Sequence, residues 1–404
     1  MPVAEANGVA LENTAFADTD ASPLLSHDAS LEQLSVAQIT LSHFRNYVAL
    51  RLNCEAAPVI LIGANGSGKT NLVEAISLLV PGRGLRRSTL ADLQNQASRE
   101  PWAVAIDMRT GSGPLKIGTG RDQAAEADGE RRLVHINGKP IRGQNALAEH
   151  IAMAWITPDM DRLLAEGATA RRKFLDRLVY SFDPAHGARV QRYEKAMRER
   201  LRLLREGCAD AAWLSALEDE MAQTAVAIAA ARRHMIGRLR TAIADSGDIF
   251  PRTDIEVRGT AEDMLTDKPA LLVEDSLRAA FARLRGEDAL HGTCATGAHR
   301  SDLRVSHRAK NCPAELCSTG EQKALLIALM LAYMRLLTQQ RRLTPLFLLD
   351  DIAAHLDDFR RRALFDELLA LGVQAWLTGT DRESFGNFAA QAQIFHVAHG
   401  LVEA

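Results

Sequence analysis

The sequence predicts an α/β fold in which a mixed sheet with an antiparallel sub-sheet is split by a helical arm. The apolar run 58–63 ends at a glycine-rich loop and precedes a helical pattern, as expected of a buried parallel strand entering a helix. Residues 184–246 are instead rich in Ala, Leu, Arg and Glu, with apolar residues every three or four positions, which indicates helices. After about His291 the α/β pattern returns. We therefore expect one domain interrupted by a helical insertion.

The composition excludes several classes of protein. The 404 residues suggest two or three structural units, and 47% hydrophobic with 25% charged residues is an ordinary globular composition. No apolar run approaches the ~20 residues of a membrane-spanning helix, so we expect no membrane association. The five cysteines lack a zinc-like spacing and predict free thiols in a reducing compartment.

Residues 1–34 are rich in Ala, Ser, Asp and Glu, and we expect a disordered acidic extension; a partner-binding tail is the alternative. Six acidic residues and no basic one precede Arg45, so removing them changes the formal net charge from −3 to +3. That mild charge favours nucleic-acid binding through a local basic face only. The segment lacks the basic start and apolar block of a secretory signal and the arginines of a presequence. We therefore expect a cytoplasmic protein.

The first part of the split domain is expected to cover residues 35–165. A helix should follow the strand at 58–63 and end near Pro81. Three alternating segments bounded by turn residues then predict an antiparallel sub-sheet beside that helix; they are residues 102–109, 114–120 and 132–138.

The helical arm is expected to cover residues 166–290, and the second part of the α/β domain residues 291–404. Two amphipathic helices within 184–246 predict an antiparallel hairpin, followed by a helix near 275–285. In the second part, a helix should follow Ser318. Strands and a final hairpin are predicted at residues 345–350, 373–379 and 394–403.

The strongest chemical signal is a glycine-rich loop between the first buried strand and its helix. It fits G-x-x-x-x-G-K-[ST], the Walker A pattern, whose backbone N–H groups surround phosphate oxygens at a helix N-terminus. Lys69 should reach the β- and γ-phosphates, and the Thr70 hydroxyl should bind Mg²⁺. The predicted nucleotide-binding residues are Gly63, Ala64, Asn65, Gly66, Ser67, Gly68, Lys69 and Thr70.

Residues 346–351 form a Walker B candidate, an apolar strand ending in two aspartates. The carboxyl end of such a strand faces the phosphates. Asp350 would hold Mg²⁺ directly or through water, and Asp351 could act as the general base toward the attacking water. An ordinary core strand ending in an acidic turn is the alternative. The predicted catalytic residues are therefore Lys69, Asp350 and Asp351, and the metal ligands are Thr70 and Asp350.

A third motif, residues 318–322, has the form S-x-G-x-Q and precedes an apolar helix about 30 residues before Walker B. Ser318, Gly320 and the helix N-terminus would form a second anion-binding surface, with Gln322 completing the motif. Ser and Gly before a helix commonly serve only as caps. The position relative to Walker A and Walker B favours a signature motif, which would bind the γ-phosphate of ATP held by a second subunit.

With these motifs the sequence resembles the RecF family, ABC-type P-loop ATPases related to the heads of SMC and Rad50 proteins. The resemblance covers about residues 36–404. The segment 354–357 resembles the D-loop. The remaining family-like segments are residues 41–47, 81–88, 156–176, 296–303, 318–326, 347–357 and 376–381.

The resemblance implies an ATP- and Mg²⁺-dependent homodimer that clamps DNA at single-strand gaps or single-strand/double-strand junctions, without sequence specificity. It implies a weak, DNA-stimulated ATPase of recombinational repair and replication-fork maintenance. It also implies RecR and RecO as partners in loading the recombinase, and a role in SOS induction. Two features depart from ABC ATPases in general: residues 151–159 contain no glutamine, and residues 378–381 lack the switch histidine. Asp351 replaces the usual Glu, and its shorter side chain predicts slow hydrolysis.

DNA contacts are expected where Lys and Arg cluster. The arginines after the Walker A helix, Arg83, Arg86 and Arg87, are the predicted DNA-binding residues, because RecF-like proteins have basic residues there. Solvated helix faces are the alternative for every cluster. Further candidates lie before and within the arm: Arg171, Arg172, Lys173, Arg232, Arg233, Arg238 and Arg240.

Two other classes share the three ATPase motifs. A transporter ATPase subunit would hold Walker A and the signature in one compact domain, whereas an arm separates Thr70 from Ser318 here. An SMC- or Rad50-like chromosome-tethering ATPase is the main alternative, but it would need a far longer arm than this insertion provides. A helical hairpin of this length reaches about 50 Å at most.

Overall fold

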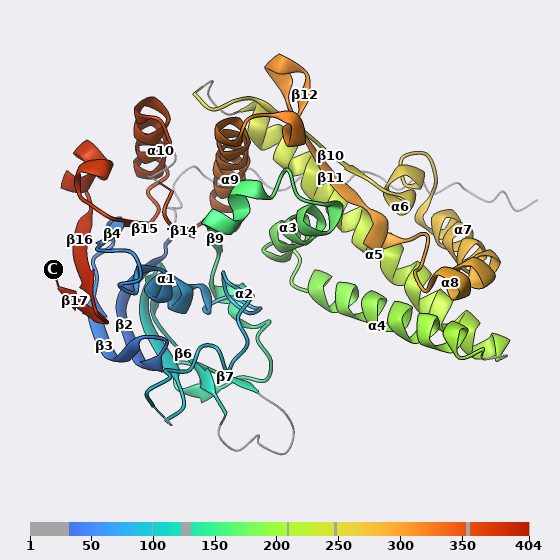
Figure 1. The fold of residues 1–404 in the computed structure, drawn as a ribbon, viewed down its shortest axis with the longest axis horizontal. Helices are drawn as coiled ribbons and strands as arrows, with labels where there is room; N and C mark the ends of the chain where they lie inside the picture. Colours follow the sequence, from blue (N-terminus) through green and yellow to red (C-terminus); the bar gives the residue numbers. More distant parts are fainter. Residues whose placement is uncertain are drawn as a thin grey trace, which may run out of the picture.

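The computed structural model describes residues 32–98, 100–122, 131–207, 210–245, 249–352 and 356–403. The chain folds into a head, which contains two sheets, and an arm, which extends to the right in Figure 1. Most of the expected acidic extension and Cys208 lie outside the described residues. The other four cysteines are free thiols, as predicted. None of the described helices combines the length and apolar character of a membrane span.

One sheet of the head carries the strand that leads into the glycine-rich loop. Its order is β17-β16-β4-β15-β14-β9, parallel throughout except for the pair β16 and β17. Every residue of four of these strands, β4, β9, β14 and β15, is buried, which explains their continuous apolar runs. The strands are β4 (Val59–Ile62), β9 (Met153–Ile156), β14 (Leu346–Leu349), β15 (Ala375–Gly379), β16 (Gln393–Ala398) and β17 (Leu401–Glu403).

The other sheet is antiparallel, with order β3-β2-β5-β6-β7-β8. The three alternating segments predicted from the sequence are β5, β6 and β7. Helix α1 (Lys69–Ser77) and both sheets contribute to one continuous apolar core. The strands are β2 (Ser35–Phe44), β3 (Tyr47–Asn53), β5 (Ala103–Thr110), β6 (Gly113–Arg121), β7 (Arg132–Ile136) and β8 (Lys139–Pro140).

The first described residues already belong to the head. Strand β1 (Glu32–Gln33) pairs in parallel with β13 (Leu343–Thr344), and Leu34 is fully buried. Their composition places these three residues in the acidic extension. Composition cannot detect a two-residue strand whose partner strand lies some 310 positions away in the sequence. The boundary of the head therefore lies before residue 35.

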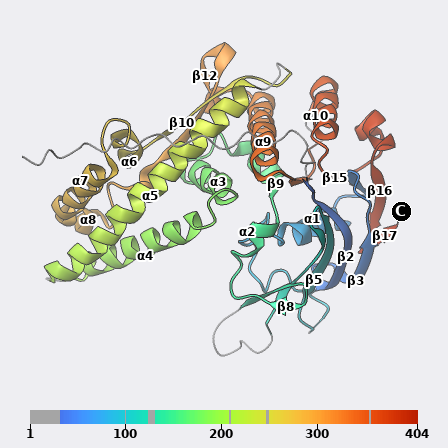
Figure 2. The ribbon, with the colours of Figure 1, turned by 180° about the vertical axis from the view of Figure 1, so that it is seen from behind.

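The arm contains the predicted helical hairpin, α4 (His186–Arg205) and α5 (Ala211–Ala244), packed along one another. In Figure 2, α5 runs from beside α9 (Thr319–Arg341) in the head to the far end of the arm. A second apolar core lies between α4, α5 and α7. The other helices are α3 (Ala168–Tyr180), α6 (Thr260–Met264), α7 (Ala270–Arg283), which begins earlier than predicted, and α8 (Arg285–His291).

A small antiparallel sheet at the base of the arm was not predicted. It consists of β10 (Thr253–Arg258), β11 (Asp302–His307) and β12 (Cys312–Pro313). Its two longer strands alternate apolar with polar residues, and this alternation was a signal that the sequence analysis did not use. The remaining elements are α2 (Leu147–His150), α10 (Asp358–Ala370) and the 3₁₀ segments η2 (Pro158–Arg162), η3 (Ala298–Arg300), η4 (Arg308–Lys310), η5 (Ala314–Leu316) and η7 (Glu383–Ala390).

Parallel pairing places several chemically important residues at one edge of the sheet. Leu349 at the end of β14 is paired with Ile156 of β9 and with Leu377 of β15, and Gly379 is paired with Ile62 of β4. The residues that follow these strands therefore converge at their carboxyl ends. They are Gly63, Thr157 and Asp350, joined there by Thr378 of β15.

Candidate nucleotide site

The glycine-rich loop connects β4 to α1 and requires glycine at specific positions. A Cβ on Gly63 (φ +155°) would come within 2.2 Å of the Val397 carbonyl oxygen. Gly66 has a φ of +79°, in the left-handed region that favours glycine. Lys69 folds back over the loop, and its Nζ donates to the carbonyl oxygens of Gly63 at 2.7 Å and Ala64 at 2.9 Å. The structure thus brings the Walker A residues together as predicted from their spacing.

The Walker A threonine and the first Walker B aspartate meet directly. Thr70 Oγ1 donates to Asp350 Oδ1 at 3.0 Å, and Thr378 Oγ1 donates to the same oxygen at 2.8 Å. The Thr378 hydroxyl also accepts a hydrogen bond from the backbone N–H of Asp351 at 2.8 Å. Thr378 was not among the predicted site residues. Its position at the end of the strand beside Walker B was the available signal.

Asp350 is a buried carboxylate that faces hydroxyl groups rather than a paired cation. It is 6% exposed, and burial raises its pKa, with a smaller contribution from the charge of Asp351. A buried anion of this kind is stabilised by a bound cation. The hydroxyl of Thr70 and the carboxylate of Asp350 are oxygen donors suited to Mg²⁺. The predicted metal ligands therefore fit the ion.

Asp351 has a backbone φ of +51°. This left-handed conformation is uncommon for non-glycine residues, and Asp and Asn tolerate it best. Strained backbone of this kind concentrates at functional sites. Asp351 and Asp350 both line the nucleotide cavity described next.

A cavity of about 290 Å³ lies between the Walker A loop and the carboxyl ends of the strands. Burial lowers the pKa of Lys69, while Asp351 and Asp350 act in the opposite direction. The buried Ser67 hydroxyl has no hydrogen-bond partner among the described residues. Besides Walker A and Walker B residues, the lining includes Asn71, Leu85, Arg86, Thr157, Pro158, Asp159 and Thr378. Residues 157–159 thus occupy the cavity wall without the glutamine that ABC ATPases often have.

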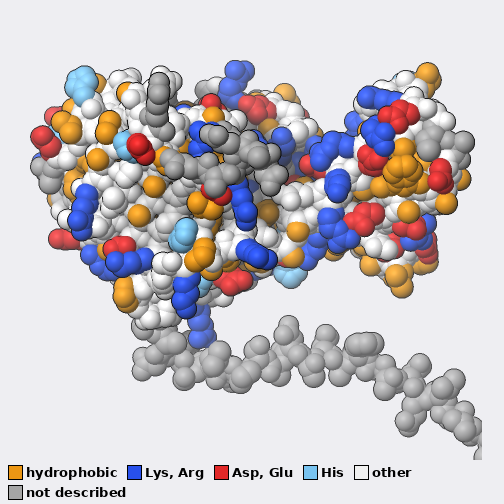
Figure 3. Space-filling model, turned by 90° about the horizontal axis from the view of Figure 1, so that it is seen from below, with side chains coloured by type: hydrophobic (Ala, Val, Ile, Leu, Met, Phe, Trp, Pro, Cys, Tyr) orange, Lys and Arg blue, Asp and Glu red, His pale blue; other side chains and the backbone are white. Residues whose placement is uncertain are grey.

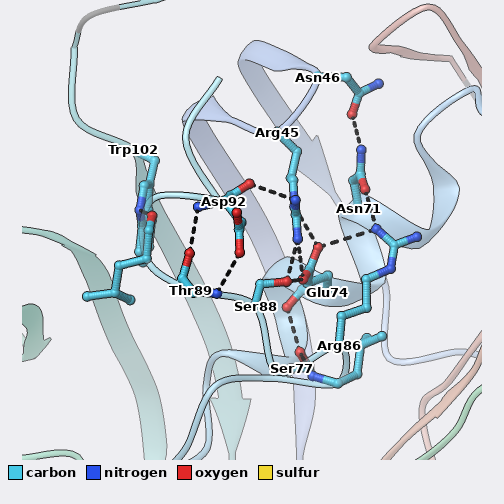
Figure 4. A network of polar contacts seen from close by, with 12 residues as sticks. Arg45, Asn46, Asn71, Glu74, Ser77, Arg86, Ser88, Thr89, Asp92 and Trp102 are labelled. Carbon is cyan, nitrogen blue, oxygen red and sulfur yellow. Dashed lines mark hydrogen bonds and ion pairs between the residues drawn. The ribbon is translucent and has the colours of Figure 1, made fainter. Parts of the chain in front are cut away.

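A network around the buried carboxylate of Glu74 connects two of the family-like segments (Figure 4). Arg45 donates to both Glu74 oxygens, at 2.9 and 2.8 Å, and Ser88 donates to Glu74 at 2.8 Å. Arg86 lies 3.5 Å from Glu74 and donates to Asn71 Oδ1 at 2.8 Å. Glu74, which is 0% exposed, therefore anchors segments 41–47 and 81–88 to α1. Its position inside an apolar helix was the signal that the sequence analysis did not use.

The signature residues lie at the N-terminus of α9 and do not line this cavity. Ser318 caps α9 in a capping box with Glu321. Ser318 and Gly320 are exposed, whereas Gln322 is 5% exposed and its Nε2 donates to the Cys317 carbonyl at 2.9 Å. In this chain Gln322 thus holds the preceding loop. The exposed part of the motif is Ser318 and Gly320, with the helix N-terminus behind them.

The D-loop candidate is only partly described. Residues 354–355 lie outside the described part of the chain, and Leu356 is buried. Asp357 caps α10, accepting a hydrogen bond from the Arg360 backbone N–H at 2.8 Å.

The three arginines after α1 separate in the structure. All are exposed, but Arg86 lines the nucleotide cavity, whereas Arg83 and Arg87 line a different cleft between the head and the arm. Arg86 therefore lies beside the nucleotide cavity, which argues against its predicted role in DNA binding. Arg83 and Arg87 therefore lie outside the nucleotide site.

Most of the other basic candidates stabilise the arm. Arg171 forms a bidentate pair with Asp302, with two contacts of 2.8 Å. Arg232 is 2% exposed and pairs with Asp176 at 2.8 and 2.9 Å. Arg172, Arg233 and Arg240 donate to backbone carbonyls, and Arg238 stacks 4.0 Å over the Phe182 ring. Arg171 and Arg232 are therefore buried ion-pair partners and not part of a solvated helix face, whereas Arg240 is exposed. Lys173 is exposed.

Comparisons with known proteins agree with this architecture. The family model described as RecF/RecN/SMC N terminal domain matches residues 35–403. The chain is 46% identical over 373 residues to the DNA replication and repair protein RecF of Mesorhizobium japonicum, covering 92% of this chain and 98% of that protein. The RecF of Rhizobium rhizogenes is 45% identical over 367 residues, covering 90% and 97%.

Solved structures show the same fold. The recombination mediator protein RecF with ATP of the RecFOR pathway has a TM-score of 0.80 at 22% identity, covering 93% of this chain and 99% of that one. An Smc head domain from Pyrococcus furiosus has a TM-score of 0.51 at 16% identity, covering 92% and 95%. The predicted fold, an ABC-type head split by a helical arm, is confirmed. By its family model and its relatives, the chain belongs to the RecF family.

Proposed function

We propose that this chain is an ATP-dependent DNA-binding protein of recombinational repair and replication-fork maintenance. One observation carries the ATP-dependent part. The Walker A and Walker B residues surround one cavity, while Ser318 and Gly320 are exposed at the N-terminus of α9 and do not line it. A nucleotide in the cavity would therefore meet a signature motif only when a second copy of the chain supplies it. ATP would be held between Walker A of one subunit and Ser318 of the other.

The Walker A and Walker B residues have separate roles in this proposal. Lys69 would exchange its two carbonyl partners for the β- and γ-phosphates, and the loop N–H groups would surround the phosphate oxygens. Thr70 and Asp350 would hold Mg²⁺, which neutralises phosphate charge when it is bound. Asp351 would accept a proton from the attacking water. Because its side chain is shorter than Glu, we expect slow hydrolysis, giving a weak, DNA-stimulated ATPase.

ATP binding would close the homodimer around DNA, and hydrolysis would open it. The solved RecF structures are described as recombination mediators of the RecFOR pathway, and the relatives as DNA replication and repair proteins. These descriptions support a role in recombinational repair with RecR and RecO as partners. The proposal adds single-strand gaps or junctions as the DNA substrate, and recombinase loading with SOS induction as the outcome. We expect this to occur in the cytoplasm.

The arm favours this proposal over a chromosome tether. Helix α5 has 34 residues, which at 1.5 Å per residue gives about 51 Å. Helices α6, α7 and α8 and the β10-β11-β12 sheet pack beside α5 and α4 to form a compact lobe. A compact lobe suits a local clamp, whereas an SMC- or Rad50-like tether requires a long coiled coil.

The test is the oligomeric state with and without ATP, measured by light scattering. Ser318→Arg places a long cation where the γ-phosphate of the partner's ATP should lie, and we expect it to abolish ATP-dependent dimerisation. Ser112→Arg makes the same change at an exposed residue in the β5–β6 turn and should dimerise normally. Normal dimerisation of Ser318→Arg would rule out the shared site.

A further inference from the structure

A second large cleft, of about 460 Å³, lies between the head and the arm. Its walls come from the segment after α1, from β9, and from α3, α4 and α5. Figure 3 views the molecule from below and shows Lys and Arg side chains in the narrow region between the head and the arm. The cleft does not share any lining residue with the nucleotide cavity.

The cleft holds positive charge that the described residues do not balance. Arg83, Arg87 and Lys173 line it, are exposed, and have no carboxylate partner in the described part of the chain. Its two acidic lining residues are already engaged. Asp176 pairs with Arg232, and Glu194 pairs with Arg198 at 3.6 Å. A ligand with negative charge would therefore meet unpaired cations.

Two groups deeper in the wall also lack ordinary partners. Arg177 stacks 4.7 Å over the Trp155 ring and contacts no carboxylate among the described residues. Burial, together with repulsion from Arg87, lowers the pKa of Arg177 to about 10. The Trp155 indole N–H is buried and has no hydrogen-bond acceptor in the described structure. A partly buried cation that is repelled by a second cation, beside a buried donor without an acceptor, is costly unless an anion completes the site.

The dimensions and walls of the cleft limit the ligand. A volume of this order accommodates a molecule of about one or two nucleotides, and a duplex is too wide to enter. Arg and Lys are the residues that neutralise phosphates. Apolar lining residues include Val80, Ile151 and Ile228. The exposed face of an unpaired base can pack against them, whereas the faces of a base within a duplex are already covered by its stacked neighbours.

We propose that the head–arm cleft binds the phosphates of unpaired nucleotides, so that each subunit holds a short single-stranded segment or end of DNA. This rests on the proposed function and adds to it the location of the single strand. In a gap or junction, the duplex would remain outside while the unpaired strand enters between the lobes. The same phosphate chemistry would also suit a free mononucleotide, and the experiment separates the two.

The experiment measures binding of fluorescein-labelled dT10 to the full chain, saturated with a non-hydrolysable ATP analogue, as a function of salt. The test variant combines Arg87→Glu with Lys173→Glu. The control combines Lys268→Glu with Arg283→Glu, the same charge change at exposed arm residues outside the cleft. Urea midpoints of both variants detect any loss of folding.

We expect the cleft variant to bind dT10 at least about tenfold more weakly than the parent, and the control to match the parent. Two lost phosphate contacts should also reduce the salt slope by about 1.4, from the single-strand value of about 0.7 per contact. Crosslinking of 4-thiothymidine in the oligonucleotide should label residues of the cleft wall. Parental affinity and slope in the cleft variant would overturn the proposal while leaving the ATP-dependent clamp intact.

Two other outcomes are decisive. If dTMP binds the ATP-saturated chain as tightly as dT10 and competes for the same residues, the occupant is a free nucleotide and the single-strand assignment is wrong. If the parent binds neither dT10 nor gapped duplex, the proposed function fails together with the cleft assignment.

Discussion

Replacing Glu74 by glutamine tests the network that joins the Walker A helix to the segments on either side of it. Glu74 is fully buried and accepts two hydrogen bonds from Arg45, whose side chain is 20% exposed. Glutamine keeps the volume but removes the charge, and its NH₂ group faces guanidinium donors. Breaking a buried ion pair costs about 3–5 kcal/mol. Because Arg45 retains some contact with water, we expect about 3 kcal/mol, a large part of a typical unfolding free energy.

Urea denaturation followed by far-UV circular dichroism measures this change. With an m-value near ~3 kcal/mol/M, the midpoint should fall by about 1 M without a change in m. Glu149→Gln makes the same substitution at an exposed side chain of α2 and should stay within about 0.5 kcal/mol of the parent. Combining Arg45→Met with Glu74→Leu should cost less than the two single changes together. If Glu74→Gln shifted the midpoint no more than Glu149→Gln, the network would not stabilise the head.

Three further predictions concern the nucleotide site and the arm. Burial raises the pKa of Asp350, so the folded chain loses stability as the pH rises and this carboxyl group ionises. Asp350→Asn cannot ionise, and its melting temperature should therefore fall less than that of the parent between about pH 4 and 7. Asp350→Asn should also lose the Mg²⁺-dependent stabilisation by ATP, and scanning fluorimetry measures both effects. Asp351→Asn tolerates the left-handed backbone, so ATP affinity should stay near parental in equilibrium dialysis while phosphate release falls; parental turnover would refute the general-base role. Arg232→Met leaves the largely buried Asp176 without its bidentate partner and should destabilise the chain by about 3–5 kcal/mol in urea melts; a stability within about 0.5 kcal/mol of the parent would show that this pair does not hold the arm together.

The sequence predicted the fold wherever local pattern and motif coincided. Strand β4, the glycine loop and α1 follow from an apolar run, glycine spacing and helical periodicity. The two hairpin helices of the arm, α4 and α5, follow from their apolar stripes. The small sheet containing β10 and β11 was missed because its two strands, although they alternate, are short and pair across the intervening helices of the arm. The parallel contact of Glu32 with Leu343 was missed for the same reason.

The candidate site shows a similar division. Walker A and Walker B were predicted because glycine and aspartate at fixed spacing have a direct chemical meaning. Thr378 and Glu74 were missed because Thr and Glu occur in many contexts, and only the fold places them beside Asp350 and Arg45. Charge clusters were the least informative pattern. Arg171 and Arg232 are internal ion-pair partners, and a sequence alone does not place the carboxylates that neutralise them.

The central claim is that ATP lies between Walker A of one subunit and the signature of another. The most direct measurement mixes two inactive variants, Lys69→Met and Ser318→Arg, and records ATP-dependent dimerisation by light scattering. Each variant alone should remain monomeric with ATP. A mixed dimer retains one intact site, formed by Walker A of the Ser318→Arg subunit and Ser318 of the Lys69→Met subunit, so the mixture should dimerise. If the mixture stayed monomeric, or if Ser318→Arg dimerised alone, the shared site would be contradicted.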